Sequence, residues 1–170
     1  KKILIDRFHN LPEEYIGDEL GVSWRTVQNT LASARKAFKV NTTPQLVLRC
    51  LELGELYIDE LTEAFDLERA KAICNTYQVL LEKSLEGGGK YESNRQIGKV
   101  VGLTHDSVST YKHRIIEALG VKTYLQAMIV YKAAIEKGII PPYEETERQN
   151  GHATLPQSAV IFTPDPHLSF

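Results

Sequence analysis

A basic, amide-rich stretch at residues 24–39 has side chains that suit the edges of nucleic-acid bases. It contains Arg25, Gln28 and Asn29 and no acidic residue. Arginine pairs with guanine O6 and N7, and asparagine or glutamine pairs with adenine N6 and N7, each good pair giving roughly 1–3 kcal/mol of discrimination. If Ser23 caps a helix, these three side chains share its outer face. We therefore predict that Arg25, Gln28 and Asn29 contact bases.

Other side chains of the same stretch suit phosphate oxygens, as do the backbone amides at a helix start. We expect phosphate contacts from five residues: Ser23, Trp24, Arg35, Lys36 and Lys39. Two alternatives stay open. Trp24 packs between the two halves of the protein instead, or the basic residues are only a solvated helix end that complements the helix dipole.

The chain repeats itself at an offset of 81 positions without a gap. Identical pairs include Ile16-Gly17 with Ile97-Gly98, Gly21 with Gly102, Val27 with Val108, Thr42 with Thr123, and Gln45 with Gln126. In further pairs an apolar residue faces an apolar one and a hydroxyl faces a hydroxyl. We interpret the chain as two copies of one supersecondary unit.

The second copy carries different side chains at the matching positions. We predict base contacts from His105, Asp106, Ser109, Thr110 and His113. We predict phosphate contacts from Arg95, Lys99, Thr104, Lys112, Arg114 and Lys122. Asp106 either accepts a hydrogen bond from cytosine N4 or repels the duplex, and the sequence leaves both outcomes open. The two copies are thus expected to read different base sequences.

Apolar residues recur at helical spacing in both copies, which predicts an all-helical protein. In the first copy a helix begins near Pro12 and ends with a turn at Gly21. In the second copy the matching helix begins at the capping box of Ser93 and ends with a turn at Gly102. Ser23 and Thr104 cap the next helices. The third helices are expected at 43–54 and 123–137, and two further helices between the copies at 56–65 and 66–86.

Four segments follow from this pattern. Residues 1–56 form the first unit, 57–92 hold the helices between the copies and a Gly-rich loop, 93–139 form the second unit, and 140–170 form an irregular, proline-containing arm. The offset places residues 1–5 opposite 82–86, so the first unit keeps only the tail of its leading helix. Either residues upstream were removed or another segment supplies that packing.

Ile16 to Leu31 resembles the LuxR/GerE-type helix-turn-helix domains, which are allied to region 4 of bacterial sigma factors. The second copy continues the resemblance through Arg114 to Thr123. It covers about 45 residues in each copy. Thr30 and Tyr111 replace a frequent histidine, and Lys39 replaces a glycine that Gly120 retains. The resemblance implies tandem helix-turn-helix units and DNA binding, with no implication for an input signal.

Composition fits an ordinary folded protein and excludes a histone-like one. The 170 residues are 42% hydrophobic and 25% charged, with a net charge of -2. Acids predominate at 57–92, so the basic stretch is a local anion-binding face. Cys50 and Cys74 lack zinc spacing and are interpreted as small buried residues in a reducing compartment. No membrane span or signal peptide is evident, and we expect a cytoplasmic protein.

No nucleophile and base stand at a catalytic spacing, so we expect neither an enzyme nor a cofactor or metal site. The favoured interpretation is a bacterial, phage or mobile-element transcriptional regulator that binds double-stranded DNA at two unlike half-sites. A homodimer would use the helix at 124–137, the helices between the copies or the C-terminal arm. The alternative is a protein-binding adaptor or antagonist that acts on RNA polymerase or another regulator.

Overall fold

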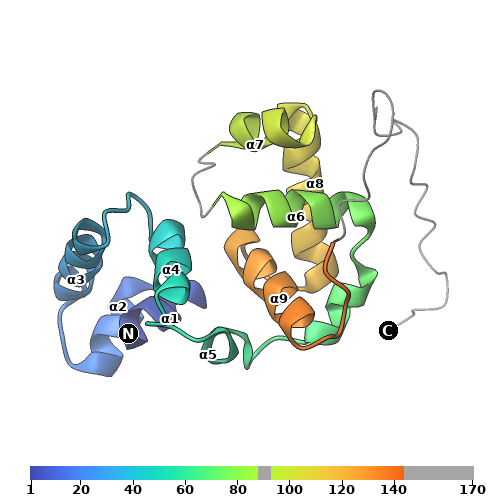
Figure 1. Cartoon of the computed structure of the whole chain (residues 1–170). Coiled ribbons are helices and arrows are strands. Elements are labelled where there is room, and N and C mark those ends of the chain that lie inside the picture. The colour runs from blue at the N-terminus through green and yellow to red at the C-terminus, as the bar shows by residue number, and fades with distance from the viewer. Residues whose placement is uncertain (88–92, 144–170) are drawn as a thin grey trace, which may run out of the picture.

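The computed structural model describes residues 1–87 and 93–143, and these residues form helices and turns without a strand (Figure 1). The predicted C-terminal arm beyond residue 143 lies outside the described residues. The elements are α1 (Lys2–Phe8), α2 (Glu13–Leu20), α3 (Trp24–Ala37), α4 (Thr43–Glu52), α5 (Ile58–Thr62), a 3-10 helix η1 (Leu67–Ala72), α6 (Asn75–Glu86), α7 (Asn94–Val101), α8 (His105–Leu119) and α9 (Tyr124–Glu136).

The helices form two groups, which lie side by side in Figure 1. The N-terminal group is α1–α4 and the C-terminal group is α6–α9. In the sequence, α5 and η1 come between the two groups. The starts of α2, α3 and α4 precede those of α7, α8 and α9 by the offset of 81 seen in the sequence. The repeat is therefore present in the order and the boundaries of the helices.

The same local signals set these boundaries in both groups. Capping boxes begin α4 at Thr42 and α9 at Thr123, where a Gln side chain three residues on bonds back to the cap. Left-handed glycines end α2 and α7, with φ of 67° at Gly21 and 71° at Gly102. A side chain at such a φ is strained, so glycine favours the turn.

A single apolar core joins the two groups, and α9 lies at its centre. Ala127, Ile129, Val130 and Tyr131 are fully buried, and α9 packs against α5, η1, α6 and α8. The amide of Gln126 donates a buried hydrogen bond of 2.7 Å to the carbonyl of Phe8 in α1. Because most side chains of α9 are buried in this core, the helix offers little surface for the homodimer contact considered from the sequence.

The structure differs from prediction between the two copies. The helix expected at 66–86 is broken, because Ile73 takes an extended conformation between η1 and α6. The break lets η1 turn across α8 and α9, where Ala70 and Ile73 become buried. The helix expected at 56–65 is only the five residues of α5. The prediction that both cysteines are buried is wrong for Cys74, which is exposed, and right for Cys50.

No helix among the described residues is long and apolar enough to cross a membrane.

Candidate nucleic-acid interface

The turn between α2 and α3 depends on a close backbone approach at Gly17. A Cβ on Gly17 would lie 2.7 Å from the carbonyl oxygen of Val22, and a Cβ on Gly98 would lie 2.5 Å from that of Leu103. No larger residue fits at either position without a backbone shift. The amides of Val22 and Leu103 also bond to the carbonyls of these glycines, at 2.9 and 2.8 Å. Each pair of helices thereby crosses at a fixed, tight corner.

Hydroxyl caps follow each corner, as predicted. Ser23 Oγ accepts a hydrogen bond of 3.1 Å from the amide of Thr26, and Thr104 Oγ1 accepts one of 3.2 Å from the amide of Ser107. Both caps are exposed. The amino-terminal ends of α3 and α8 are therefore open to solvent, where a helix end favours an anion such as phosphate.

The outer face of α3 has the composition predicted for it. Val27 is fully buried and Leu31 is 6% exposed, whereas Arg25, Gln28 and Asn29 are exposed. No acidic residue occurs on α3. The helix thus separates an apolar inner side from a basic and amide-bearing outer side.

Trp24 lies on the surface beside Arg25. It is 43% exposed, and the Arg25 guanidinium carbon is 5.4 Å from the centre of its ring. At that distance the cation is attracted to the ring face. The alternative in which Trp24 packs between the two copies does not fit this exposure.

Gln28 has a partner that the sequence did not suggest. Its amide nitrogen donates a hydrogen bond of 2.6 Å to Glu13 Oε2 in the first turn of α2. The two residues are 15 positions apart, and only the tight corner brings them together. Helix α2 therefore places a carboxylate beside one of the predicted base-reading side chains.

The five residues of the second copy predicted to contact bases are all exposed on α8. His105 Nδ1 lies 3.1 Å from the carboxylate of its neighbour Asp106. This face is less basic than that of α3. The preceding helix α7 carries the exposed Arg95 and Lys99 and no acid, whereas α2 has Glu14 and Asp18 at the matching positions.

The residues predicted to hold phosphates lie on the surface, apart from two that are half-buried, Arg35 and Lys112. The ammonium of Lys112 lies 4.6 Å from the ring centre of Tyr124, and burial lowers the pKa of Lys112. The exposed members form no ion pair with another described residue: Lys36, Lys39, Arg95, Lys99, Arg114 and Lys122. Their charge is available to an anion from outside.

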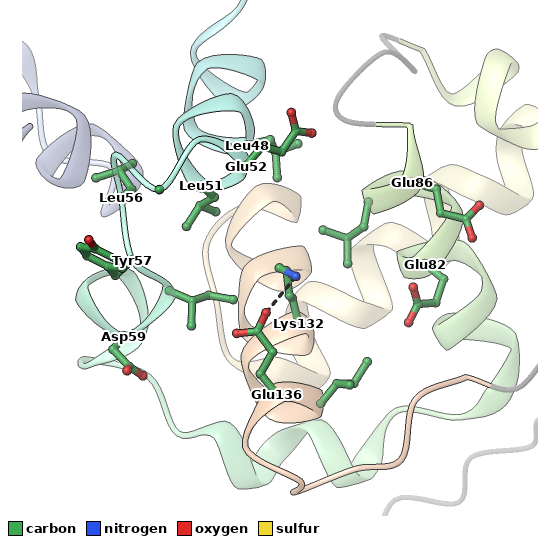
Figure 2. A pocket seen from close by; sticks show the side chains of 14 residues that line it. Leu48, Leu51, Glu52, Leu56, Tyr57, Asp59, Glu82, Glu86, Lys132 and Glu136 are labelled. Atoms are coloured by element: carbon green, nitrogen blue, oxygen red, sulfur yellow. Dashed lines mark ion pairs between the residues drawn. The ribbon is translucent and has the colours of Figure 1, made fainter.

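A groove of about 760 Å³ lies elsewhere, between the two helical groups (Figure 2). Leu51 of α4 lines it, and the carboxylate of Glu136 pairs with Lys132 at 2.9 Å. Glu82 accepts a hydrogen bond of 3.1 Å from Tyr131, whose pKa is raised by burial. None of the residues predicted to contact DNA lines this groove, and no cluster of potential metal ligands occurs among the described residues.

In comparisons with known proteins, no protein-family model, no curated protein and no solved structure matches the chain.

Proposed function

We propose that the chain is a sequence-specific DNA-binding transcriptional regulator with two helix-turn-helix units, α2–α3 and α7–α8. The observation that carries the proposal is the outer face of α3. It exposes Arg25, Gln28 and Asn29 on a helix without an acid, capped by Ser23 after a glycine corner. In a helix-turn-helix unit the second helix lies in the major groove, and its first residues meet base edges.

The second unit supports the same function with a different readout. Its corner at Gly102 and its cap at Thr104 repeat those of the first unit. In place of the guanidinium and amide groups of the first unit it has Asp106, Ser109 and Thr110. One chain would then act as a pseudo-dimer on two unlike half-sites. Phosphate contacts come from the open helix starts and from the unpaired lysines and arginines around them.

Selection of bound duplexes from a random pool tests the proposal. The full chain should enrich an asymmetric motif, because the two recognition helices carry different side chains. A palindromic motif would show instead that one unit alone reads bases in a homodimer. Recovery of no motif would remove the proposal of sequence-specific binding.

Salt dependence supplies a second measurement on the same complex. Contacts to Z phosphates release counterions, so the logarithm of the affinity falls with the logarithm of salt concentration with a slope of about -0.9Z. With both units engaged we expect Z of roughly six or more, since six unpaired cations surround the two helices. A slope near zero would contradict binding through phosphates.

A protein-binding adaptor remains the second candidate, and the acidic start of α2 favours it. Glu13 and Glu14 lie in that first turn, and Glu13 accepts a hydrogen bond from the side-chain amide of Gln28. Carboxylates beside a recognition helix oppose a phosphate backbone and suit a basic protein surface. Binding to purified RNA polymerase, measured beside binding to the DNA pool, distinguishes the two candidates.

A further inference from the structure

The groove of about 760 Å³ between the two helical groups leaves apolar side chains open to solvent. Half-buried aliphatic residues from four helices line it: Leu51 of α4, Ile58 of α5, Leu85 of α6 and Ile135 of α9. Tyr57, which is 61% exposed, lies among them. Burial of such surface against another apolar surface is favourable, so this lining suits an apolar face brought from outside.

Carboxylates surround the apolar lining. The charged residues that line the groove are five acids and one lysine, a net charge of -4: Glu52, Asp59, Glu82, Glu86, Glu136 and Lys132. Figure 2 shows Glu52 and Asp59 on one side of the groove, and Glu82 and Glu86 on the opposite side. The apolar lining therefore lies between two negatively charged walls.

Three of these carboxylates have a cation as a neighbour. The pairs are Arg49–Glu52 at 2.9 Å, Lys83–Glu86 at 3.0 Å and Lys137–Asp59 at 2.7 Å. In each pair the carboxylate lines the groove and the cation does not. Each pair thus turns its negative end toward the groove. Because the carboxylates of these pairs are exposed, the pairs are weak, and a cation from outside can bind the same carboxylates.

Glu82 has no cation as a partner among the described residues. It is half-buried, and it accepts a hydrogen bond of 3.1 Å from the hydroxyl of Tyr131, which is a neutral donor. A partly desolvated carboxylate with a neutral partner attracts a cation that a ligand brings. The wall formed by α6 is therefore a favourable place for a lysine or an arginine.

We propose that this groove is a docking site for a basic amphipathic helix of a partner protein. The helix presents apolar side chains at i, i+3, i+4 and i+7 to Leu51, Leu85 and Ile135, and it places lysines or arginines beside the carboxylates on both sides. The proposal is independent of DNA binding, because none of the residues predicted to contact DNA lines the groove.

The chain's own segments fit this site poorly. Helices α3 and α7 carry exposed cations and no acid, but the only exposed large apolar side chain is Trp24 on α3 and Val100 on α7. Neither helix presents an apolar row beside its cations. Residues 144–170, which lie outside the described part of the chain, contain four acids and one arginine, Arg148, so their charge opposes that of the groove. A separate protein is therefore the occupant that charge and composition favour.

A synthetic peptide of about 16 residues provides the probe. It has leucine at i, i+3, i+4 and i+7 and lysine at the flanking positions, carries a fluorophore, and is titrated with the full chain. One comparison peptide has glutamate in place of every lysine. A second alternates the same leucines and lysines, so that it has no apolar face as a helix. We expect the probe to bind at least about tenfold more tightly than either comparison peptide. Equal affinities, or no binding of the probe, would overturn the proposal.

Charge reversal on the chain locates the binding site. Glu86→Lys changes a carboxylate that lines the groove, and Glu68→Lys makes the same change outside it. The two residues are a matched pair, because each is exposed and each forms an ion pair with a lysine three positions away. We expect Glu86→Lys to reduce probe affinity by at least about fivefold and Glu68→Lys to change it by less than about twofold. Equal reductions would show attraction to the charge of the whole chain and would overturn the proposal.

Two exposed tyrosines test the apolar contact without disturbing the core. Tyr57 lines the groove and is 61% exposed, whereas Tyr15 is 56% exposed and lies outside it. Tyr57→Ala should lower probe affinity by at least about threefold, because a large apolar contact is lost, and Tyr15→Ala should leave it unchanged. Unchanged binding by Tyr57→Ala would contradict the proposed position of the helix.

Competition and sedimentation distinguish the other occupants. An unlabelled peptide with the sequence of residues 144–170 should fail to displace the probe from the full chain. Displacement by this peptide would make the chain's own end the occupant and overturn the proposal. The probe should also leave the sedimentation of the chain unchanged apart from its own mass. A dimer that dissociates when the probe binds would assign the groove to a second copy and overturn the proposal as well.

Discussion

The side-chain amide of Gln28 on α3 donates a hydrogen bond of 2.6 Å to the carboxylate of Glu13 on α2. This contact holds a predicted base-reading group in place across the corner of the paired helices. It also sets a negative charge beside the surface proposed to meet phosphates. The Gln28 amide nitrogen carries two N–H donors, so the bond to Glu13 engages one of them and restricts how the other can be directed at a base.

Removal of this acceptor should therefore strengthen DNA binding. Glu13→Ala frees the Gln28 amide and removes one negative charge, while Glu14→Ala in the same helical turn removes only the charge. On the best site from the selection, we expect Glu13→Ala to gain about threefold more affinity than Glu14→Ala, since the lost partner was a charge-assisted hydrogen bond. Fluorescence anisotropy at one salt concentration makes the comparison. Equal gains would show that the bond between Gln28 and Glu13 does not compete with DNA binding.

Arg25 and Lys36 should give different kinds of loss. Arg25→Ala should lower affinity for the best site by roughly tenfold and relax the preference at one base pair, because a bidentate pair to guanine is lost. Lys36→Ala should weaken binding to all sequences alike and reduce the salt slope by about one. Selections repeated with each variant measure the preference. If both variants lose affinity equally for all sequences, Arg25 does not contact a base.

Gly98 should resist even the smallest enlargement. The added methyl of Gly98→Ala would meet the backbone oxygen of Leu103, which no rotamer change relieves. Overpacking of this kind costs roughly 1–3 kcal/mol, and the better helix propensity of alanine offsets about 1 kcal/mol of that. Urea unfolding should show net destabilisation for Gly98→Ala and little change for the exposed Lys99→Ala. A stabilised Gly98→Ala would contradict the close corner.

The stability of the fold should depend on the protonation of His9. Its ring stacks on Phe65 with centroids 5.6 Å apart, and burial lowers its pKa in the folded state, with a smaller opposing effect from Asp6. The unfolded chain then binds the proton more readily, so this contribution is present above pH 6.5 and decreases as the pH is lowered through about 6.5.

Urea unfolding between pH 7.5 and 5.5 measures this contribution. The original chain should lose more stability over that interval than His9→Gln, in which the group no longer titrates. The exposed His113→Gln serves as the control and should follow the original chain. Parallel loss in the His9→Gln variant would rule out a role for His9 in this pH dependence.

The sequence predicted the elements that rest on local signals. Gly21 and Gly102 need left-handed backbone, and Ser23 and Thr104 bond to amides three residues away, so short-range chemistry determines where these helices end and begin. The repeat made each signal visible twice. Helical spacing also predicted which side of α3 is buried and which is exposed. The residues predicted to contact bases are exposed.

Features that depend on distant partners were missed. No glycine or proline marks the break at Ile73, since it arises where η1 meets α8 and Arg69 bonds to carbonyls 48 and 49 positions away. The bond between Gln28 and Glu13 likewise exists only after α2 and α3 cross.

The left-handed backbone at Lys39 also bears on how this chain would respond to selection. A non-glycine residue in this conformation costs roughly 1–2 kcal/mol, and Gly120 meets the same geometry without that strain. Selection for thermal stability alone should thus enrich Lys39→Gly, whereas selection for DNA binding should retain the lysine, which is predicted to contact phosphate. The end of α3 is a position where robustness and recognition are expected to pull the sequence in opposite directions.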